Sequence, residues 1–128
     1  MKTSCWDYKG LGRVAICRST PRGGAPAGYR MFKALAPGAW FNTTAKPEYE
    51  RLYQDEILGK LDPQKVWDDL HKLTGGAEPV LLCWEKPPLT ETNFCHRRMV
   101  ADWFENALGV FVPELGFEMA SRQQGLHL

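Results

Sequence analysis

Cys95, His96 and Arg97 are consecutive, and their side chains are a thiol, an imidazole and a guanidinium. A helix is predicted to begin near Phe94 and to run to about Leu108, so these residues fall in its first turn. The free N–H groups and the positive end of the helix dipole favour anions there and lower the pKa of a thiol. Arg97 adds a guanidinium fork that suits a carboxylate or a phosphate. The run therefore predicts an anion site, with Cys95 and His96 as candidate catalytic residues.

Glu85 is the third candidate catalytic residue. It ends a predicted strand over Pro79–Glu85 and is expected at the same edge as the helix start, where it could orient His96 or act as a base. The simpler alternatives are a salt bridge from Glu85 to a nearby arginine and a core histidine bonded to a backbone carbonyl. Adjacent side chains on a helix point apart, so a direct Cys95–His96 pair is not expected. A base for Cys95 is expected from another segment.

A second group of residues suited to binding anions follows a predicted strand over Arg13–Ser19. Guanidinium, hydroxyl and ammonium groups would hold a phosphate, and aromatic rings would stack on a base. The alternative is that the rings anchor a long loop to the core. The stretch has neither the ending of a Walker loop nor the helix that a dinucleotide fingerprint requires. The predicted ligand-binding residues here are Arg18, Ser19, Arg22, Tyr29 and Lys33, in addition to Arg97.

The four cysteines are Cys5, Cys17, Cys83 and Cys95. Cys83, Cys95 and His96 could converge on zinc, but the cysteines lack the short spacing of the usual zinc knuckles, and adjacent ligands on a helix point apart. The sequence therefore predicts no metal and no cofactor. It favours reduced thiols, with Cys17 and Cys83 as small core residues.

The elements that position these groups are indicated by apolar spacing and by capping residues. Further strands are predicted over Lys2–Trp6 and Val110–Val112. Helices are predicted from Pro47, from Pro63 after the N-cap Asp62, and from the N-cap Asn93. Residues 19–47 have four glycines, four prolines and no clean period, so they are predicted to form a long functional loop.

Strands alternating with amphipathic helices predict an α/β fold. We expect one three-layer domain over residues 1–120, with a small, mostly parallel, Rossmann-like sheet flanked by helices, and a loose tail over residues 121–128. In such sheets a ligand binds beyond the carboxyl ends of the strands. That rule selects the loop after Ser19 and the loop between Glu85 and Asn93.

Composition and charge limit the classes of protein to which the chain can belong. The chain has 128 residues, of which 44% are hydrophobic and 24% charged, and this excludes disordered, collagen-like and coiled-coil classes. The longest apolar run, Val80–Trp84, is far shorter than the roughly 20 residues that cross a bilayer. Without a secretion leader, a cytoplasmic protein with no membrane contact is expected. Residues 1–47 carry eight Lys or Arg and one acid, whereas residues 48–128 carry eight and fourteen.

Two segments of the chain, residues 82–87 and 93–103, resemble the family of unknown function numbered 488, found in bacteria and their phages. The hallmark of that family is a strand ending in Cys-aromatic-Glu, a short loop, and Phe-Cys-His-Arg opening a helix. The resemblance extends to residues 15–22, 29–37 and 57–63, although residues 88–92 lengthen the loop before the helix. It implies a compact α/β domain and supplies no reaction. The residues that it implies at one edge of the domain are Arg18, Glu85, Cys95, His96 and Arg97.

Three functions are compatible with these residues. The first is an enzyme acting on a phosphorylated or nucleotide-like substrate, whose anion is held by Arg18, Ser19 and Arg97. Glu85 and His96 would then be base and acid, with Cys95 polarising or attacking the substrate. The second is a module that binds a nucleotide, a signal molecule or nucleic acid without turnover. The third is an adaptor whose basic half docks an acidic partner.

Overall fold

The computed structural model describes residues 1–20 and 28–118. Three strands come first along the chain, and helices precede and follow the fourth strand. Among these residues no helix is both long enough and apolar enough to cross a bilayer. The elements are β1 (Lys2–Cys5), β2 (Arg13–Ala15), β3 (Arg30–Met31), η1 (Lys33–Leu35), η2 (Ala39–Asn42), α1 (Lys46–Glu56), η3 (Leu58–Lys60), α2 (Pro63–Leu73), β4 (Val80–Cys83) and α3 (His96–Leu108), where η marks a 3-10 helix.

The four strands form one sheet in the order β1-β4-β2-β3, and each neighbouring pair is parallel. All four residues of β4 are buried. This agrees with the prediction from its continuous apolar run, which is typical of a central strand covered on both faces. Cys5 lies opposite Cys83, and Ala15 lies opposite Leu82. The predicted α/β class with a small parallel sheet is confirmed.

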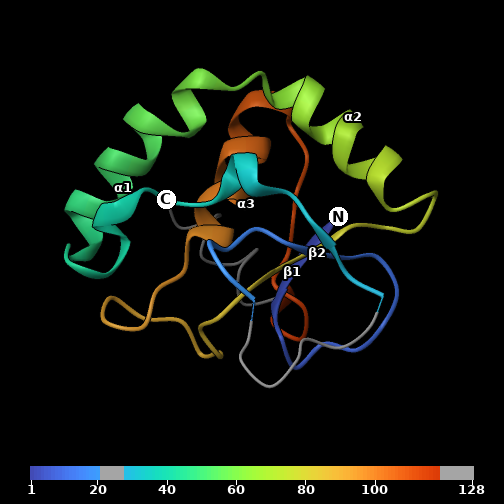
Figure 1. Cartoon of the computed structure of the whole chain (residues 1–128), viewed down its shortest axis with the longest axis horizontal. Helices are drawn as coiled ribbons and strands as arrows, with labels where there is room; N and C mark the ends of the chain where they lie inside the picture. Colours follow the sequence, from blue (N-terminus) through green and yellow to red (C-terminus); the bar gives the residue numbers. More distant parts are fainter. Residues whose placement is uncertain (21–27, 119–128) are drawn as a thin grey trace.

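The two faces of the sheet are covered differently. Figure 1 shows α1 and α2 arching over α3, with the strands on the far side of α3. Val14, Ile16 and Leu81 pack with these helices in one apolar cluster. On the other face Trp6 and Tyr29 pack edge to face, with ring centroids 5.2 Å apart, over a second cluster that contains Cys83 and Cys95. The second covering layer is therefore built from loop residues, whereas flanking helices were predicted.

Two predicted segments differ from the structure. Val110–Val112 is not a strand; the chain instead meets β1 slightly later, through a single bridge between Thr3 and Glu114. Pro113 has no N–H to donate, which limits the pairing at this edge. The predicted loop over residues 19–47 contains β3, η1 and η2. β3 forms because it pairs with β2, and the Phe32 N–H extends this pairing by donating to the Ala15 carbonyl.

The start of α2 agrees with its prediction. Asp62 is the N-cap, its carboxylate accepts a hydrogen bond from Gln64 N–H at 3.0 Å, and Pro63 occupies the first turn. The predicted tail over residues 121–128 and the candidate Arg22 lie outside the described residues.

Loss of this cap has a modest expected effect on stability. Asp62→Ala leaves a first-turn N–H without its acceptor and is expected to lower the free energy of unfolding by about 1 kcal/mol. Asp62→Asn keeps an acceptor oxygen and is expected to retain most of that stability. Urea denaturation measures both variants, and equal losses in the two would contradict the capping role.

Candidate functional site

A cleft of about 630 Å³ opens at the carboxyl ends of β2 and β4. This is the edge of the sheet at which the topology places a ligand. The side chains that line it come from the ends of these strands, from residues 37–49, and from the segment that leads into α3. They include Cys17, Arg18, Ser19, Phe41, Tyr49, Cys83, Trp84, Glu85, Asn93, Phe94 and His96.

Cys83, Cys95 and His96 form the floor of the cleft, where two thiols lie close to one imidazole. His96 Nδ1 lies 3.4 Å from Cys83 Sγ and 3.7 Å from Cys95 Sγ. The expectation that Cys95 and His96 point apart is wrong. Cys95 is the N-cap of α3, and its extended backbone (φ −141°, ψ 142°) turns its side chain toward that of His96. Helical splaying applies only from His96 onward.

The second ring nitrogen of His96 determines its tautomer. His96 Nε2 lies 2.7 Å from the carbonyl oxygen of Ile16, which ends the ladder of β2. A carbonyl only accepts, so Nε2 must carry a proton and donate it. In the neutral ring the lone pair is therefore on Nδ1, the nitrogen that faces both sulfur atoms. The predicted alternative of a histidine held by a backbone carbonyl is present, and it orients the ring toward the thiols.

Cys83, Cys95 and His96 are close enough to change one another's pKa values. Burial opposes ionisation of Cys95, but a hydrogen bond with Cys83, the charge on His96 and the nearby Arg97 together bring the pKa of Cys95 well below its usual value. Burial also opposes protonation of His96, yet the Cys95 thiolate raises the pKa of His96 above its ordinary value. Burial and the neighbouring Cys95 raise the pKa of Cys83. The pKa of Cys95 is therefore lowered and that of His96 raised, in each case against the effect of burial.

Glu85 lies on the wall of the cleft next to this floor. Its Oε2 is 4.0 Å from Cys83 Sγ. Burial and then the Cys95 thiolate raise the pKa of Glu85 above its usual range. Because Glu85 lines the cleft, its carboxyl group is within reach of a ligand there, as a base must be.

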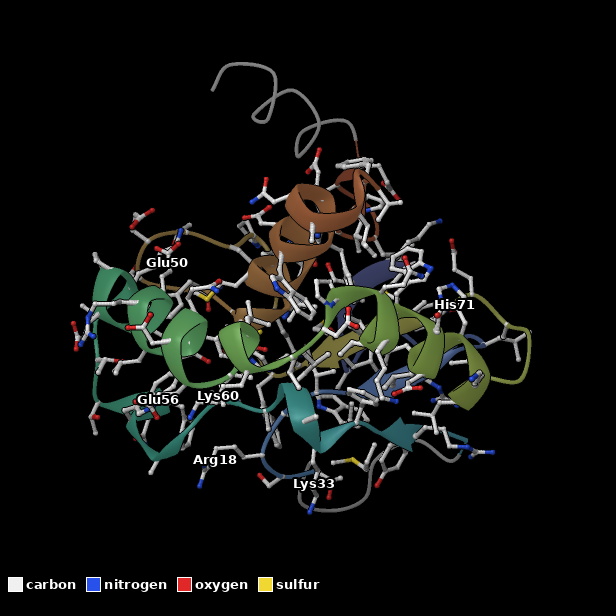
Figure 2. The ribbon with its side chains drawn as sticks, turned by 90° about the horizontal axis from the view of Figure 1, so that it is seen from above. Arg18, Lys33, Glu50, Glu56, Lys60 and His71 are labelled. Atoms are coloured by element: carbon white, nitrogen blue, oxygen red, sulfur yellow. The ribbon has the colours of Figure 1, made fainter. Side chains whose placement is uncertain are left out.

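Arg18 and Ser19 line the cleft at the end of β2. One Arg18 nitrogen, Nη1, donates to the carbonyl of Pro37 at 2.9 Å, and the guanidinium lies 5.3 Å from the centre of the Phe41 ring. These contacts hold the guanidinium in place while leaving further donors. Figure 2 shows Arg18 at the outer edge of the molecule, on the side that also carries Lys33.

Arg97 does not line the cleft, so its predicted role in anion binding needs correction. The side chain is fully buried, and its Nε and Nη2 donate to the two oxygens of Glu114 at 3.0 and 2.8 Å. Glu114 also accepts from the hydroxyl of Thr3 at 2.6 Å. Arg97 leaves α3 toward β1 and the segment beside it, and there it anchors the helix.

Asn93 is also placed differently from its prediction. The N-cap of α3 is Cys95, and the helix begins at His96. The Asn93 amide instead donates to the carbonyls of Lys86 and Pro88 at 2.8 and 3.0 Å. It thereby closes the loop between β4 and α3 and holds the cleft wall.

Two other predicted ligand residues lie away from the lining. Tyr29 packs against Trp6 on the loop-covered face of the sheet. This contact fits the alternative to base stacking, in which an aromatic ring anchors the long loop to the core. Lys33 is exposed in η1. Of the predicted set within the described residues, the structure brings Arg18, Ser19, Glu85 and His96 to the cleft, with Cys95 directly behind it.

Cys83 was left out of the predicted site, because its convergence with Cys95 and His96 was considered for zinc and not favoured. It was predicted to be a small core residue, and it is 2% exposed, yet it also lines the cleft beside His96. The available signal was its place at the carboxyl end of a buried strand, directly before Trp84 and Glu85. Trp84 was likewise not predicted at the site, whereas Phe41 belongs to the aromatic residues of the long loop that were considered for stacking on a base. Their side chains are 45% and 42% exposed on the cleft walls.

The fold and site define a small α/β protein with a cysteine- and histidine-containing cleft at the carboxyl edge of a parallel sheet. The family described as "Domain of unknown function DUF488" matches residues 17–104, which contain the whole cleft lining. The chain belongs to this family. Comparisons with curated proteins and with solved structures found no match.

Proposed function

We propose that the protein binds a phosphate-bearing, nucleotide-like small molecule in the cleft and acts on it chemically. The observation that carries this proposal is that one cleft combines a guanidinium, exposed aromatic walls and a reactive sulfur–imidazole floor. Its volume of about 630 Å³ suits a molecule of nucleotide size.

Arg18 and Ser19 are the proposed phosphate ligands. The Pro37 carbonyl and the Phe41 ring position the Arg18 guanidinium before a ligand arrives, which lowers the entropy lost on binding. A guanidinium has five N–H donors, so donors remain for the oxygens of a phosphate. The Ser19 hydroxyl adds a neutral donor at the same strand end.

Trp84 and Phe41 are the proposed stacking surfaces. Large aromatic side chains that remain this exposed at the mouth of a cleft offer a π-face to a planar ring. Stacking on a nucleotide base contributes about 1–3 kcal/mol per base. Because stacking tolerates different bases, the proposed ligand is a nucleotide-like class of molecule and not one particular nucleotide.

Glu85 and the floor are the proposed chemical groups. Glu85 is placed to accept a proton from a ligand or a water in the cleft, and His96 faces the same space. Cys95 is 3% exposed and lies behind His96 and Cys83. A direct attack by Cys95 would therefore require the floor to open, and its proposed role is to polarise the groups in front of it.

Arg18→Ala tests the binding site. Loss of a charge-assisted hydrogen bond is expected to weaken nucleotide binding by about 10- to 100-fold. Thermal shift and calorimetry with inorganic phosphate, nucleosides and nucleoside phosphates measure this effect. Lys60→Ala removes an equal charge from exposed η3, away from the cleft, and is expected to leave affinity unchanged.

Incubation followed by product analysis separates catalysis from binding alone. A nucleotide that is altered by the unmodified chain supports the enzymatic proposal. Binding without any product would contradict it and would favour the alternative of a non-catalytic binding module. If neither phosphate nor any nucleotide stabilises the protein, the ligand class itself is wrong.

A further inference from the structure

We propose that Cys83, Cys95 and His96 form a binding site for a thiophilic divalent cation, with Zn²⁺ as the favoured ion. Each residue offers one ligand atom, and these atoms all lie within 4.8 Å of one another. Among residues 1–20 and 28–118 no other group of three or more His, Cys, Asp or Glu side chains converges in this way. The inference goes beyond ligand binding in the cleft, and its test needs no nucleotide.

The two sulfur–nitrogen separations match the edges of a zinc tetrahedron. Zn–S bonds of about 2.3 Å and Zn–N bonds of about 2.0–2.1 Å place sulfur and nitrogen ligands about 3.6 Å apart. The two sulfur atoms lie 3.4 and 3.7 Å from His96 Nδ1. An ion could therefore enter between these three atoms with only small side-chain adjustments.

His96 is already oriented as a metal ligand. Its Nε2 donates to the Ile16 carbonyl at 2.7 Å, which leaves the lone pair of the neutral ring on Nδ1. Metal-binding histidines are characteristically held in this way, with the second ring nitrogen bonded to a carbonyl or a carboxylate. A core histidine needs only one such bond, whereas this one also directs its free nitrogen at two thiols.

The backbone makes the two adjacent ligands compatible. Cys95 is in an extended conformation and His96 is the first residue of α3, so their side chains converge. Cys83 approaches from the end of β4, a separate element. Ligands from the two elements would tie the strand to the helix, which is a common use of structural metal sites.

Charge balance also favours a divalent ion. Two thiolates neutralise Zn²⁺, so the buried site would carry no net charge. In the free protein the cluster has two protons to lose, whether as two thiols or as one thiol beside a thiolate–imidazolium pair. Metal binding therefore releases about two protons per ion.

The fourth coordination position would face the cleft. Cys83 and His96 line the cleft while Cys95 lies behind them, so the open side of the three ligands points toward the ligand space. A zinc ion with three protein ligands retains a position for water and lowers the pKa of that water. If the proposed function holds, Glu85, 4.0 Å from Cys83 Sγ, is placed to take the proton of such a water.

The test uses the full chain, kept reduced and stripped of metal with a chelator. Titration with Zn²⁺ against a chromophoric chelator is expected to show one tight site and the release of about two protons. Cys83→Ser and Cys95→Ser are each expected to weaken binding by about 100-fold or more, since even residues that support a ligand contribute 10- to 100-fold. Cys5→Ser is the matched control, because it replaces a buried free thiol that is not one of the three proposed ligands and should leave affinity unchanged.

Co²⁺ provides a readout that does not depend on the folding of any variant. The unmodified chain is expected to develop thiolate-to-cobalt charge-transfer absorption at one equivalent. Absence of this band, or Zn²⁺ affinity equally weakened by Cys5→Ser, would overturn the proposed ligand set. A failure of nucleotide binding would leave this result untouched, so the two proposals fail separately.

Discussion

Arg97→Met is expected to lower the free energy of unfolding by about 3–5 kcal/mol, because it removes one partner of a buried ion pair. Arg97 is fully buried and Glu114 is 5% exposed, and two hydrogen bonds join them. Methionine fills much of the same volume but leaves the Glu114 carboxylate buried, with the Thr3 hydroxyl still donating to it. Urea or guanidinium denaturation, followed by fluorescence, measures the loss.

A double variant and a surface control distinguish this explanation from simple loss of packing. Arg97→Met with Glu114→Leu removes both charges, and such replacements are often neutral, so much of the stability is expected to return. Arg51→Met breaks exposed pairs with Glu48 and Asp55 and is expected to change stability very little. If the single and double variants are equally destabilised, the ion pair is not the cause.

The same pair bears on the candidate site. Arg97 follows His96 directly, and its bonds to Glu114 join the first turn of α3 to the segment beside β1. Loosening that anchor is expected to displace His96 and Cys95 relative to the end of β4. The double variant is expected to restore stability without the anchor. Its Zn²⁺ affinity therefore tests whether anchoring or charge governs the proposed metal binding in the cleft floor.

Gly12→Ala is expected to lower the free energy of unfolding by about 3 kcal/mol or more, from backbone strain and overpacking together. Gly12 has φ +78°, a conformation that L-residues rarely adopt. A Cβ added there would overlap the carbonyl oxygen of Glu78. Gly12 also accepts the Val80 N–H at 2.8 Å, at the start of the β2–β4 ladder.

Gly109→Ala is the matched control for this substitution. Gly109 ends α3 with φ +70°, but an added Cβ meets nothing within 4 Å. Alanine there is expected to cost about 1–2 kcal/mol, the strain alone. Thermal and chemical denaturation compare the pair. Equal losses at the two positions would contradict a close approach between Gly12 and the chain before β4.

The sequence was most informative where local rules decide the structure. Asp62 and Pro63 begin α2 as predicted, since an N-cap and a first-turn proline act within a few residues. The apolar run before Glu85 correctly indicated a buried strand of a parallel sheet, although β4 ends at Cys83. The chain after Ser19 was harder to predict, because β3 exists only through its pairing with β2.

The candidate site shows the same contrast between local rules and long-range contacts, here for single side chains. Cys95 and His96 were expected to diverge because adjacent residues on a helix do, but Cys95 stands just outside the helix. A shift of the helix start by two residues therefore reverses their relation. Boundaries of this kind depend on which carbonyls and N–H groups find partners, and periodicity specifies them poorly.

The sequence by itself determined an α/β protein with parallel strands, and it located a cleft-forming edge from strand ends alone, since topology places those ends together. Only the tertiary structure decided which side chains meet there. Arg97 turned inward to Glu114, and Cys83 came from β4 to join His96, because partners distant in the sequence compete for each polar group. Burial penalises any charge left unpaired, so these long-range pairings determine the direction in which each reactive residue points.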